Sequence, residues 1–152
     1  MHKKMGTNHT MIDVGPLSNI QNFEFTHEAL GTIKGKNFLK DDLGLSGMEI
    51  SLNSFPANTS IPFYHRHEQN EELYVFIKGQ GQFQVDDETF DVKEGSMVRV
   101  APQGVRTGRN NSNEDLYYFV VQARANSLPH IISLLSNKAS TIGHSGAESP
   151  EH

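Results

Sequence analysis

The segment Phe63–Phe83, FYHRHEQNEELYVFIKGQGQF, places two histidines one residue apart and then two acids directly before an apolar run. Successive side chains of a strand point to opposite faces, so His65 and His67 share one face. At about 3.3 Å of rise per residue, their Cα atoms lie roughly 6.5–7 Å apart, and both imidazoles can converge on one metal ion. A carboxylate from the next strand would complete a facial set that suits Fe, Mn, Ni or Zn. The alternative is a solvated surface pair, because an isolated His-x-His is a weak motif.

Short runs rich in β-branched and aromatic residues recur on both sides of this segment, from Met48 to Arg124. Clusters of Gly, Pro, Asn and Asp separate these runs every 8–12 residues or so, roughly the spacing of a β-sandwich or small barrel. Two runs, ELYVFI (72–77) and LYYFVV (116–121), are apolar on both faces, as expected of strands inside a double-sheet body. The sequence therefore predicts an all-β barrel or jelly roll.

The composition is that of one domain: 152 residues, 36% of them hydrophobic, with no cysteine and a formal net charge of -5. The lack of cysteine excludes disulfides and thiolate metal sites. The mild acidity provides no basic surface for nucleic acid or for a membrane. We find no secretory signal and no apolar run long enough to span a bilayer. These observations predict a cytoplasmic protein without nucleic-acid or membrane partners.

The two ends of the chain lack the strand pattern. Residues 1–20 are predicted to form an irregular arm, which contains the apolar patch MIDVGPL (11–17). The segment LPHIISLLS (128–136) favours a short helix, and the Ser/Gly/Glu-rich remainder favours a flexible tail. The predicted organisation is an arm at 1–20, a barrel at 21–125, and a short helix with a tail at 126–152.

The spacing around the two histidines resembles the first motif of the cupin family, which is His-x-His, three or four residues, Glu, six residues, Gly. Residues 65–79 match it with His65, His67, EQNE, Glu72, LYVFIK and Gly79. The distance to Gly79 selects Glu72 rather than Glu71, which strand parity alone leaves open. The resemblance implies a double-stranded β-helix, the cupin jelly-roll barrel.

The second cupin motif is Gly, five or six residues, Pro-x-Gly, two residues, His, three residues, Asn. Residues 95–111 resemble it, from Gly95 through Pro102-Gln103-Gly104 to Asn111. Thr107 stands where the family places its last metal-binding histidine. By this resemblance His65, His67 and Glu72 hold a divalent transition metal (Fe, Mn, Ni or Zn). The loss of one ligand predicts weaker binding, although three protein ligands are enough for a catalytic-type site.

A substrate pocket is predicted beside this metal site. Tyr74 and Phe76 share the strand parity of Glu72, with plain core packing as the alternative. Arginines near the second motif suit an anionic ligand, because a guanidinium binds a carboxylate or phosphate through two hydrogen bonds; surface ion pairing is the alternative. The predicted pocket consists of Tyr74, Phe76, Arg99, Arg106 and Thr107.

Two functions remain open from the sequence. The first is a metal-dependent enzyme acting on a small, anionic organic molecule as an oxygenase, isomerase or lyase. Glu71, Tyr74 and Arg106 are the candidates for its acid or base. The second is a metal-free or weakly metal-binding sensor or binding module without catalysis, which the missing histidine favours. The family resemblance also implies a homodimer that pairs back to back through a sheet, with residues 11–17 as an exchanged arm.

Overall fold

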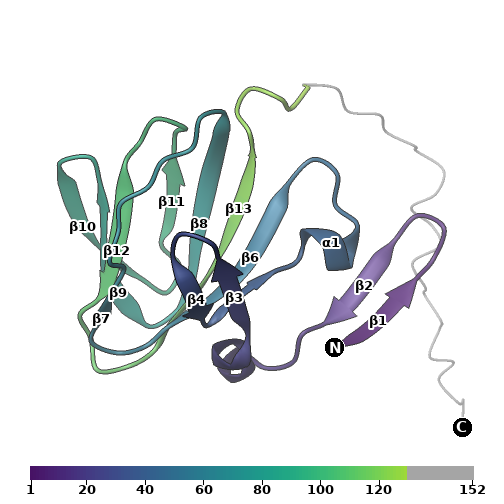
Figure 1. Cartoon of the computed structure of the whole chain (residues 1–152), viewed down its shortest axis with the longest axis horizontal. Coiled ribbons are helices and arrows are strands. Elements are labelled where there is room, and N and C mark those ends of the chain that lie inside the picture. Colours follow the sequence, from purple (N-terminus) through teal and green to yellow (C-terminus); the bar gives the residue numbers. More distant parts are fainter. Residues whose placement is uncertain (130–152) are drawn as a thin grey trace, which may run out of the picture.

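Two antiparallel sheets face each other in the computed structural model, of which residues 1–129 are described (Figure 1). The helix and flexible tail predicted for the C-terminal segment fall almost entirely outside the described residues. The larger sheet, in the order β11–β8–β13–β6–β5, consists of β5 (Lys36–Phe38), β6 (Glu49–Phe55), β8 (Asn70–Lys78), β11 (Met97–Val100) and β13 (Leu116–Arg124). The smaller sheet, in the order β10–β9–β12–β7, consists of β7 (Thr59–Ser60), β9 (Gln80–Val85), β10 (Glu88–Lys93) and β12 (Arg106–Asn110).

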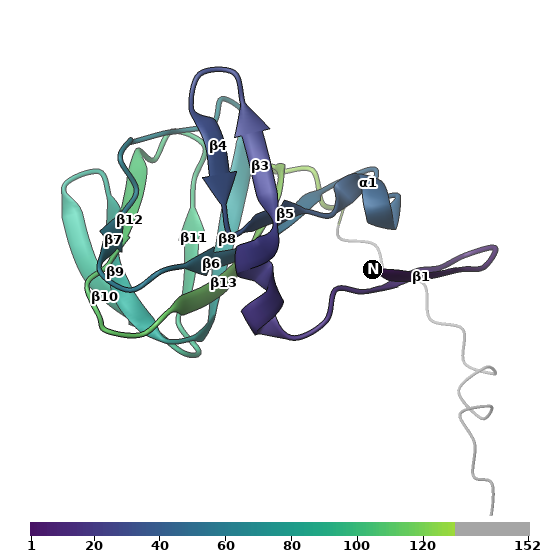
Figure 2. The same ribbon diagram turned by 60° about the horizontal axis from the view of Figure 1, so that its bottom comes forward.

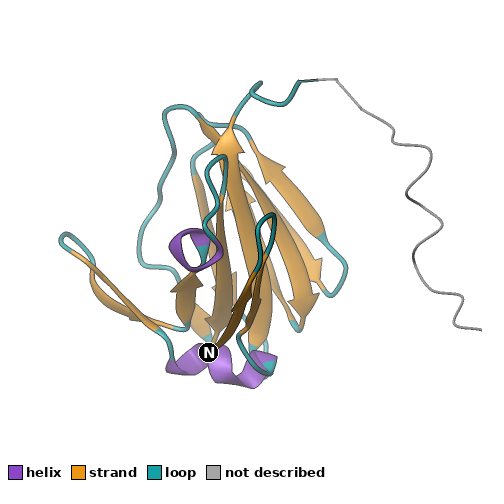
Figure 3. Cartoon of the chain, turned by 90° about the vertical axis from the view of Figure 1, so that its right-hand side faces the viewer, coloured by secondary structure: helices purple, strands orange, loops and turns teal. Residues whose placement is uncertain are grey.

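The predicted all-β architecture is confirmed, but the two sheets are not closed into one continuous barrel. Each sheet keeps its own hydrogen-bonding network. Figure 3 shows that most of the described chain is strand or loop, with helix only in α1 (Lys40–Leu43) and the 3-10 segment η1 (Leu17–Asn22). None of the helices in residues 1–129 is long and apolar enough to cross a membrane.

The N-terminal segment is more regular than the sequence predicted. Strands β1 (His2–Met5) and β2 (Thr10–Asp13) form an antiparallel hairpin that projects away from the two sheets (Figure 2). Its side chains are mostly exposed to solvent, and Met5 has 68% of its surface accessible. A second hairpin, β3 (Glu24–His27) and β4 (Gly31–Lys34), stands beside the β5 edge of the larger sheet.

Apolar side chains from both sheets meet in one core. The fully buried cluster contains Tyr74, Phe76, Phe83, Val92, Val100, Leu116 and Val120. The rings of Tyr74 and Phe83 lie 4.7 Å apart in a tilted arrangement, which joins β8 to β9 across the sandwich. Each large apolar side chain buried in this way contributes about 1.5–3 kcal/mol. The core therefore fixes the distance between the two sheets. The geometry of the polar residues at the edge of the core depends on this distance.

Gly79, at the turn from β8 into β9, has a backbone that other residues tolerate poorly. Its φ angle is +88°, and a Cβ atom built there would lie 2.5 Å from the carbonyl oxygen of Asp115. Gly95 has nearly the same φ angle, +87°, but a Cβ atom there would meet nothing within 4 Å. The two positions therefore separate backbone strain from steric exclusion.

We expect Gly79→Ala to reduce the free energy of unfolding by at least about twice as much as Gly95→Ala. Gly95→Ala is the control: it costs only about 1–2 kcal/mol, the free energy needed to place a residue with a Cβ atom in a left-handed backbone conformation. Gly79→Ala must also displace the backbone at Asp115. Chemical denaturation followed by circular dichroism measures both values. Equal losses in the two variants would contradict a steric role for Gly79.

Candidate functional site

The two histidines lie on the segment that runs between β7 and β8, and backbone bonds hold this segment in place. The amide of His65 donates to the carbonyl of Arg106 (3.2 Å) and the amide of Arg106 donates back (3.0 Å), while the His67 amide donates to Pro102 (3.1 Å). The strand predicted around the two histidines is thus reduced to a single antiparallel β-bridge between His65 and Arg106. Residues 61–67 nevertheless alternate between half-buried and exposed, so both histidines face inward as parity predicted.

The structure brings His65, His67 and Glu72 together. One possible ligand atom from each residue lies within 4.8 Å of the others. The Nε2 atom of His67 is 2.9 Å from Oε1 of Glu72, and Nε2 of His65 is 3.9 Å from Oε2. The two imidazole rings are nearly perpendicular, at 83°. The histidine side chains are 36% and 29% exposed but that of Glu72 only 7%, so solvent reaches the group from the histidine side.

The other side of the Glu72 carboxylate is held by Arg106 and Tyr74. Arg106, which is fully buried, donates from Nε (3.0 Å) and Nη2 (2.6 Å) to Oε2, and the Tyr74 hydroxyl donates to the same oxygen at 2.6 Å. The remaining Nη1 of Arg106 donates to the carbonyl of Gly104. Oε2 therefore accepts three hydrogen bonds, and Oε1 lies against Nε2 of His67.

These contacts determine the ionisation of Glu72. Burial alone would raise the pKa of its carboxyl, but the hydrogen bonds from Tyr74 and Arg106 and the guanidinium charge together hold that pKa below its usual value. Burial, together with the carboxylate charge, strongly raises the pKa of the Tyr74 hydroxyl. Tyr74 accordingly stays protonated and serves as a fixed donor to Glu72.

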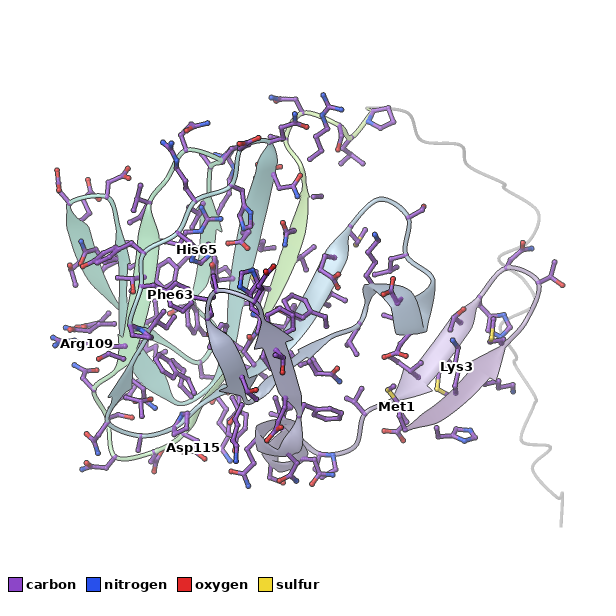
Figure 4. All side chains as sticks on the ribbon, in the orientation of Figure 1. Met1, Lys3, Phe63, His65, Arg109 and Asp115 are labelled. Carbon is purple, nitrogen blue, oxygen red and sulfur yellow. The ribbon has the colours of Figure 1, made fainter. Side chains whose placement is uncertain are left out.

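Arg106 occupies the inward position that the motif assigned to Thr107. In the pairing of β12 with β9, Arg106 lies opposite Val85 and Thr107 opposite Gln84, so Thr107 points to the outer face of the smaller sheet. There it lines an open groove of about 460 Å³ together with Gln84 and Arg109, on the far side of the sheet from the histidines. Figure 4 shows Arg109 extending outward from this sheet.

A one-residue shift in the second motif explains this difference. Asn110 is 1% exposed and its amide donates to the carbonyls of Phe55 (2.9 Å) and Glu114 (2.7 Å), whereas Asn111 is exposed. The structural asparagine is thus Asn110, and the His-to-Asn spacing of the motif counted back from it falls on Arg106. Counted forward from Pro102-Gln103-Gly104 the motif falls on Thr107, but counted back from the buried Asn110 it falls on Arg106.

Two further pocket candidates lie apart from the histidines. Arg99 is opposite Leu73 on the outer face of the larger sheet, where its side chain is 63% exposed and pairs with Glu71 at 2.7 Å. An exposed pair of this kind contributes about 0–1 kcal/mol. Phe76 packs in the core and lines a cavity of only about 10 Å³, roughly the room for one water molecule.

The sequence gave no signal for Lys36, which projects onto the same side of the larger sheet as Glu72. Lys36 lies on β5 opposite Asn53, and its Nζ donates to Oδ1 of Asn53 (2.9 Å) and approaches Oγ of Ser51 (3.5 Å). Asn53 and Ser51 are both buried. The inward face of this sheet therefore carries the polar residues Lys36, Asn53 and Ser51 over β5 and β6.

The protonation of His65 also bears on what the site can hold. Burial first, and the Arg106 charge second, lower the pKa of its imidazole to about 4, although the Glu72 charge acts in the opposite direction. The ring is therefore neutral at neutral pH, which is the form that binds a metal or accepts a proton. Its Nδ1 atom is buried and has no hydrogen-bond partner among the described residues.

The donor set fits a divalent transition metal, but not a strongly bound one. Two imidazoles and Oε1 of an ionised carboxylate, which lies 2.9 Å from Nε2 of His67, provide three ligands of suitable chemistry. Arg106, however, adds a fixed positive charge at the position where the family motif has a neutral imidazole. This charge offsets that of the Glu72 carboxylate and so weakens the attraction of the site for a dication.

Two facing antiparallel sheets, with His65, His67 and Glu72 gathered between them, define a double-stranded β-helix domain. Residues 52–122 match the family model described as the cupin domain, and the chain has the cupin fold. A cupin protein from Bacteroides fragilis has a similar structure, with 29% identity, a TM-score of 0.67, and coverage of 84% of this chain and 93% of that one.

Other similar proteins support the same fold. A Cupin 2 conserved barrel domain protein from Salinispora arenicola is 15% identical, with a TM-score of 0.57 over 76% of this chain and 91% of that one. A predicted oxalate decarboxylase from Thermotoga maritima is 19% identical, with a TM-score of 0.56 over 67% and 90%. The uncharacterized protein MJ1618 of Methanocaldococcus jannaschii is 33% identical over 52 residues, which span 34% of this chain and 42% of that protein.

We expect His65 to make the stability of the protein depend on pH in weak acid. The imidazole is neutral in the folded and unfolded chains above pH 6.5, its unperturbed pKa. Between pH 6.5 and about 4 the unfolded chain binds the proton and the folded chain does not, so the unfolding free energy falls as the pH falls through this window. Denaturation in the presence of a chelator should show a smaller loss for His65→Asn than for the wild type.

The matched control is His2→Asn, which changes an exposed histidine on β1. It should keep the wild-type dependence on pH. Identical pH profiles for His65→Asn and His2→Asn would show that His65 is not the titrating group.

Proposed function

We propose that this cupin binds a small organic molecule at the exposed edge of His65 and His67, where a divalent transition metal (Fe, Mn, Ni or Zn) is held weakly by these histidines and Glu72. The observation that carries the proposal is the convergence of three donor atoms within 4.8 Å on the side that solvent reaches. A bound metal would supply Lewis-acid polarisation of a ligand oxygen. The chain itself supplies the Glu72 carboxylate, which Arg106 and Tyr74 hold in place. It also supplies two imidazoles, and that of His65 is neutral at neutral pH.

A binding module without catalysis is the second candidate, and the surroundings of Glu72 favour it. Each of the three acid or base candidates is already engaged: Glu71 pairs with Arg99 on the outer face, and Tyr74 and Arg106 donate to Glu72. Neither the tyrosine hydroxyl nor the guanidinium is free to transfer a proton at neutral pH. The guanidinium also neutralises the carboxylate that a metal would need.

The metal affinity of three variants separates these two functions. We expect the wild type to bind Mn, Fe, Ni or Zn weakly, and His65→Ala to abolish that binding. Arg106→His should bind about 10–100-fold more tightly, because it removes a positive charge and returns an imidazole to the inward position. Metal analysis and calorimetric titration of the purified proteins measure these affinities.

Arg106→Met is the control for the loss of charge alone. Removing one partner of a buried ion pair costs about 3–5 kcal/mol, so the fold of each Arg106 variant is checked by circular dichroism before titration. A wild-type protein that refuses all four metals would remove the metal from the proposal and leave the binding module. An Arg106→His protein that binds no better than Arg106→Met would contradict the role assigned to this position.

We also propose that the chain forms a homodimer through the outer face of the larger sheet. Apolar side chains stand in two adjacent rows on this face: Met97, Val75, Phe119 and Leu52 in one, and Leu73, Val121 and Ile50 in the other. None of them is fully buried in the single chain. An antiparallel sheet that is apolar on both faces needs a second covering layer.

The dimer is tested by Leu73→Asp, which places a charge in the middle of this face at a residue that is 38% exposed. We expect the variant to run as a monomer in size-exclusion chromatography with light scattering, while the wild type runs as a dimer. Leu30→Asp, at a similarly exposed residue of the β3–β4 turn, should remain dimeric. A wild type with the mass of one 17.0 kDa chain would rule the dimer out.

A further inference from the structure

The side chain of Lys36 is half-buried and forms no ion pair within residues 1–129. Its ammonium contacts only neutral groups: the side chains of Asn53 and Ser51, and the ring of Phe38, whose centroid is 4.8 Å away. No carboxylate lies within 4 Å of it among the described residues. Other buried charges in this domain are paired, as Arg106 is with Glu72. An ammonium that is partly removed from water and meets only neutral groups lacks the negative charge that would balance it, so Lys36 needs an explanation.

Contacts with Phe38 and Asn53 hold the Lys36 side chain in place. Phe38 lies edge-on to Phe25 of the β3–β4 hairpin, with ring centroids 4.8 Å apart, so the hairpin covers the ring over which the ammonium lies. The buried Asn53 is itself oriented by donation from its amide to the carbonyl (3.1 Å) and the hydroxyl (3.1 Å) of Ser51, which leaves its Oδ1 for Lys36. Figure 2 shows the β3–β4 hairpin standing over β5 and β6.

Lys36 and the histidine group belong to the same interior. Strand pairing aligns Lys36, Asn53, Tyr118 and Phe76 in one row across β5, β6, β13 and β8, and Glu72 follows two rows further along the same face. Burial lowers the pKa of the Lys36 ammonium, while the charges of Glu72 and Glu49 raise it, so these carboxylates lie within electrostatic reach. Neither forms an ion pair with it: Glu72 is engaged by Arg106, and Oε1 of Glu49 accepts from the amides of Lys40 and Ile50.

Tyr118 lies between the two groups. Its ring stacks on Tyr74, with centroids 6.2 Å apart, and its hydroxyl has no hydrogen-bond partner in the part of the chain that the structure describes. The interior therefore offers an ammonium, a phenol and the buried Nδ1 of His65 as groups whose bonds are incomplete. All three can bind an oxygen-rich ligand, and the ammonium requires that this ligand be negatively charged.

We propose that the Lys36 ammonium binds a carboxylate of the small molecule held in the cupin interior, and so makes the site selective for organic acids. The inference rests on the proposed function, in which a ligand reaches the interior through the edge of His65 and His67. The carboxylate completes the hydrogen bonds of Lys36 and supplies the missing negative charge. The opposite end of the ligand lies towards His65 and His67, and Tyr118 lies between these histidines and Lys36.

A structural role for Lys36 is the competing explanation. In that case the side chain serves only to fill the space between Phe38 and Asn53, and its charge is incidental. Lys36→Met keeps the length and packing of the side chain and removes the charge, whereas Lys36→Arg keeps the charge. Lys34→Met provides a matched control, because Lys34 is an exposed lysine on the neighbouring strand and pairs with Glu24.

The experiment titrates these proteins by calorimetry with malonate, succinate and glutarate and with the uncharged diamide of each acid. It is done first with a chelator and then with added Mn²⁺. We expect the wild type to bind at least one diacid, and to bind its diamide at least about tenfold more weakly. Lys36→Met should weaken the diacid by a similar factor and leave the diamide unchanged. Lys36→Arg should keep the preference for the diacid, and Lys34→Met should match the wild type.

The outcomes separate this inference from the metal site. Binding that depends on Lys36 in a protein that takes up no metal would support the inference and overturn the metal-binding proposal. Metal uptake through His65, combined with diacid affinities that Lys36→Met leaves unchanged, would overturn the inference alone. A wild-type protein that binds none of the three acids would overturn it as well. Thermal unfolding and the Mn²⁺ affinity of Lys36→Met show whether the variant is folded.

Discussion

The buried ion pair between Glu72 and Arg106 is the contact on which the geometry of the site depends. Glu72 comes from the larger sheet and Arg106 from the smaller one, so the pair joins the two layers across the interior. Each charge needs the other, since a lone buried charge costs about 3–5 kcal/mol. The guanidinium takes one carboxylate oxygen and, with the Tyr74 hydroxyl, fixes the rotation of the group. The other oxygen is thereby directed at His67, and the chemistry of the site follows from that orientation.

Much of the fold could be predicted from local features of the sequence. Runs with two apolar faces and regularly spaced turns are enough to indicate a double-sheet body, and the spacing from His65 to Gly79 identified Glu72 over its neighbour Glu71. Thr107 was placed at the site because the spacing from Pro102-Gln103-Gly104 and the spacing to Asn111 both select it, whereas the asparagine that the structure buries is Asn110. Only burial separates them, and burial is a tertiary property: Asn110 is held by carbonyl groups of Phe55 and Glu114.

Lys36 could not be found in this way, for a physical reason. Its inward direction depends on the pairing of β5 with β6, which sets Lys36 opposite Asn53 although 17 residues separate them in sequence. A short three-residue strand has no periodicity from which a face can be inferred, and a lysine in a loop-like segment is most often exposed. Arg99 was misplaced for a different reason. Its strand is regular, but the sequence does not show which face of the strand is buried. The pairing of Arg99 with Leu73 places its side chain on the outer face.

The charges of the interior favour an organic anion more than a metal as the group that completes it. Glu72 and Arg106 cancel, and His65 is neutral at neutral pH, which leaves the Lys36 charge unbalanced. A divalent metal would add two positive charges to an interior that already has one in excess, and its only carboxylate ligand is shared with a guanidinium. A carboxylate would instead bring the interior to neutrality and complete the bonds of Lys36. In the proposed site, an arginine at the inward position of Arg106 does more than remove a ligand, because it also neutralises the carboxylate that would attract a metal.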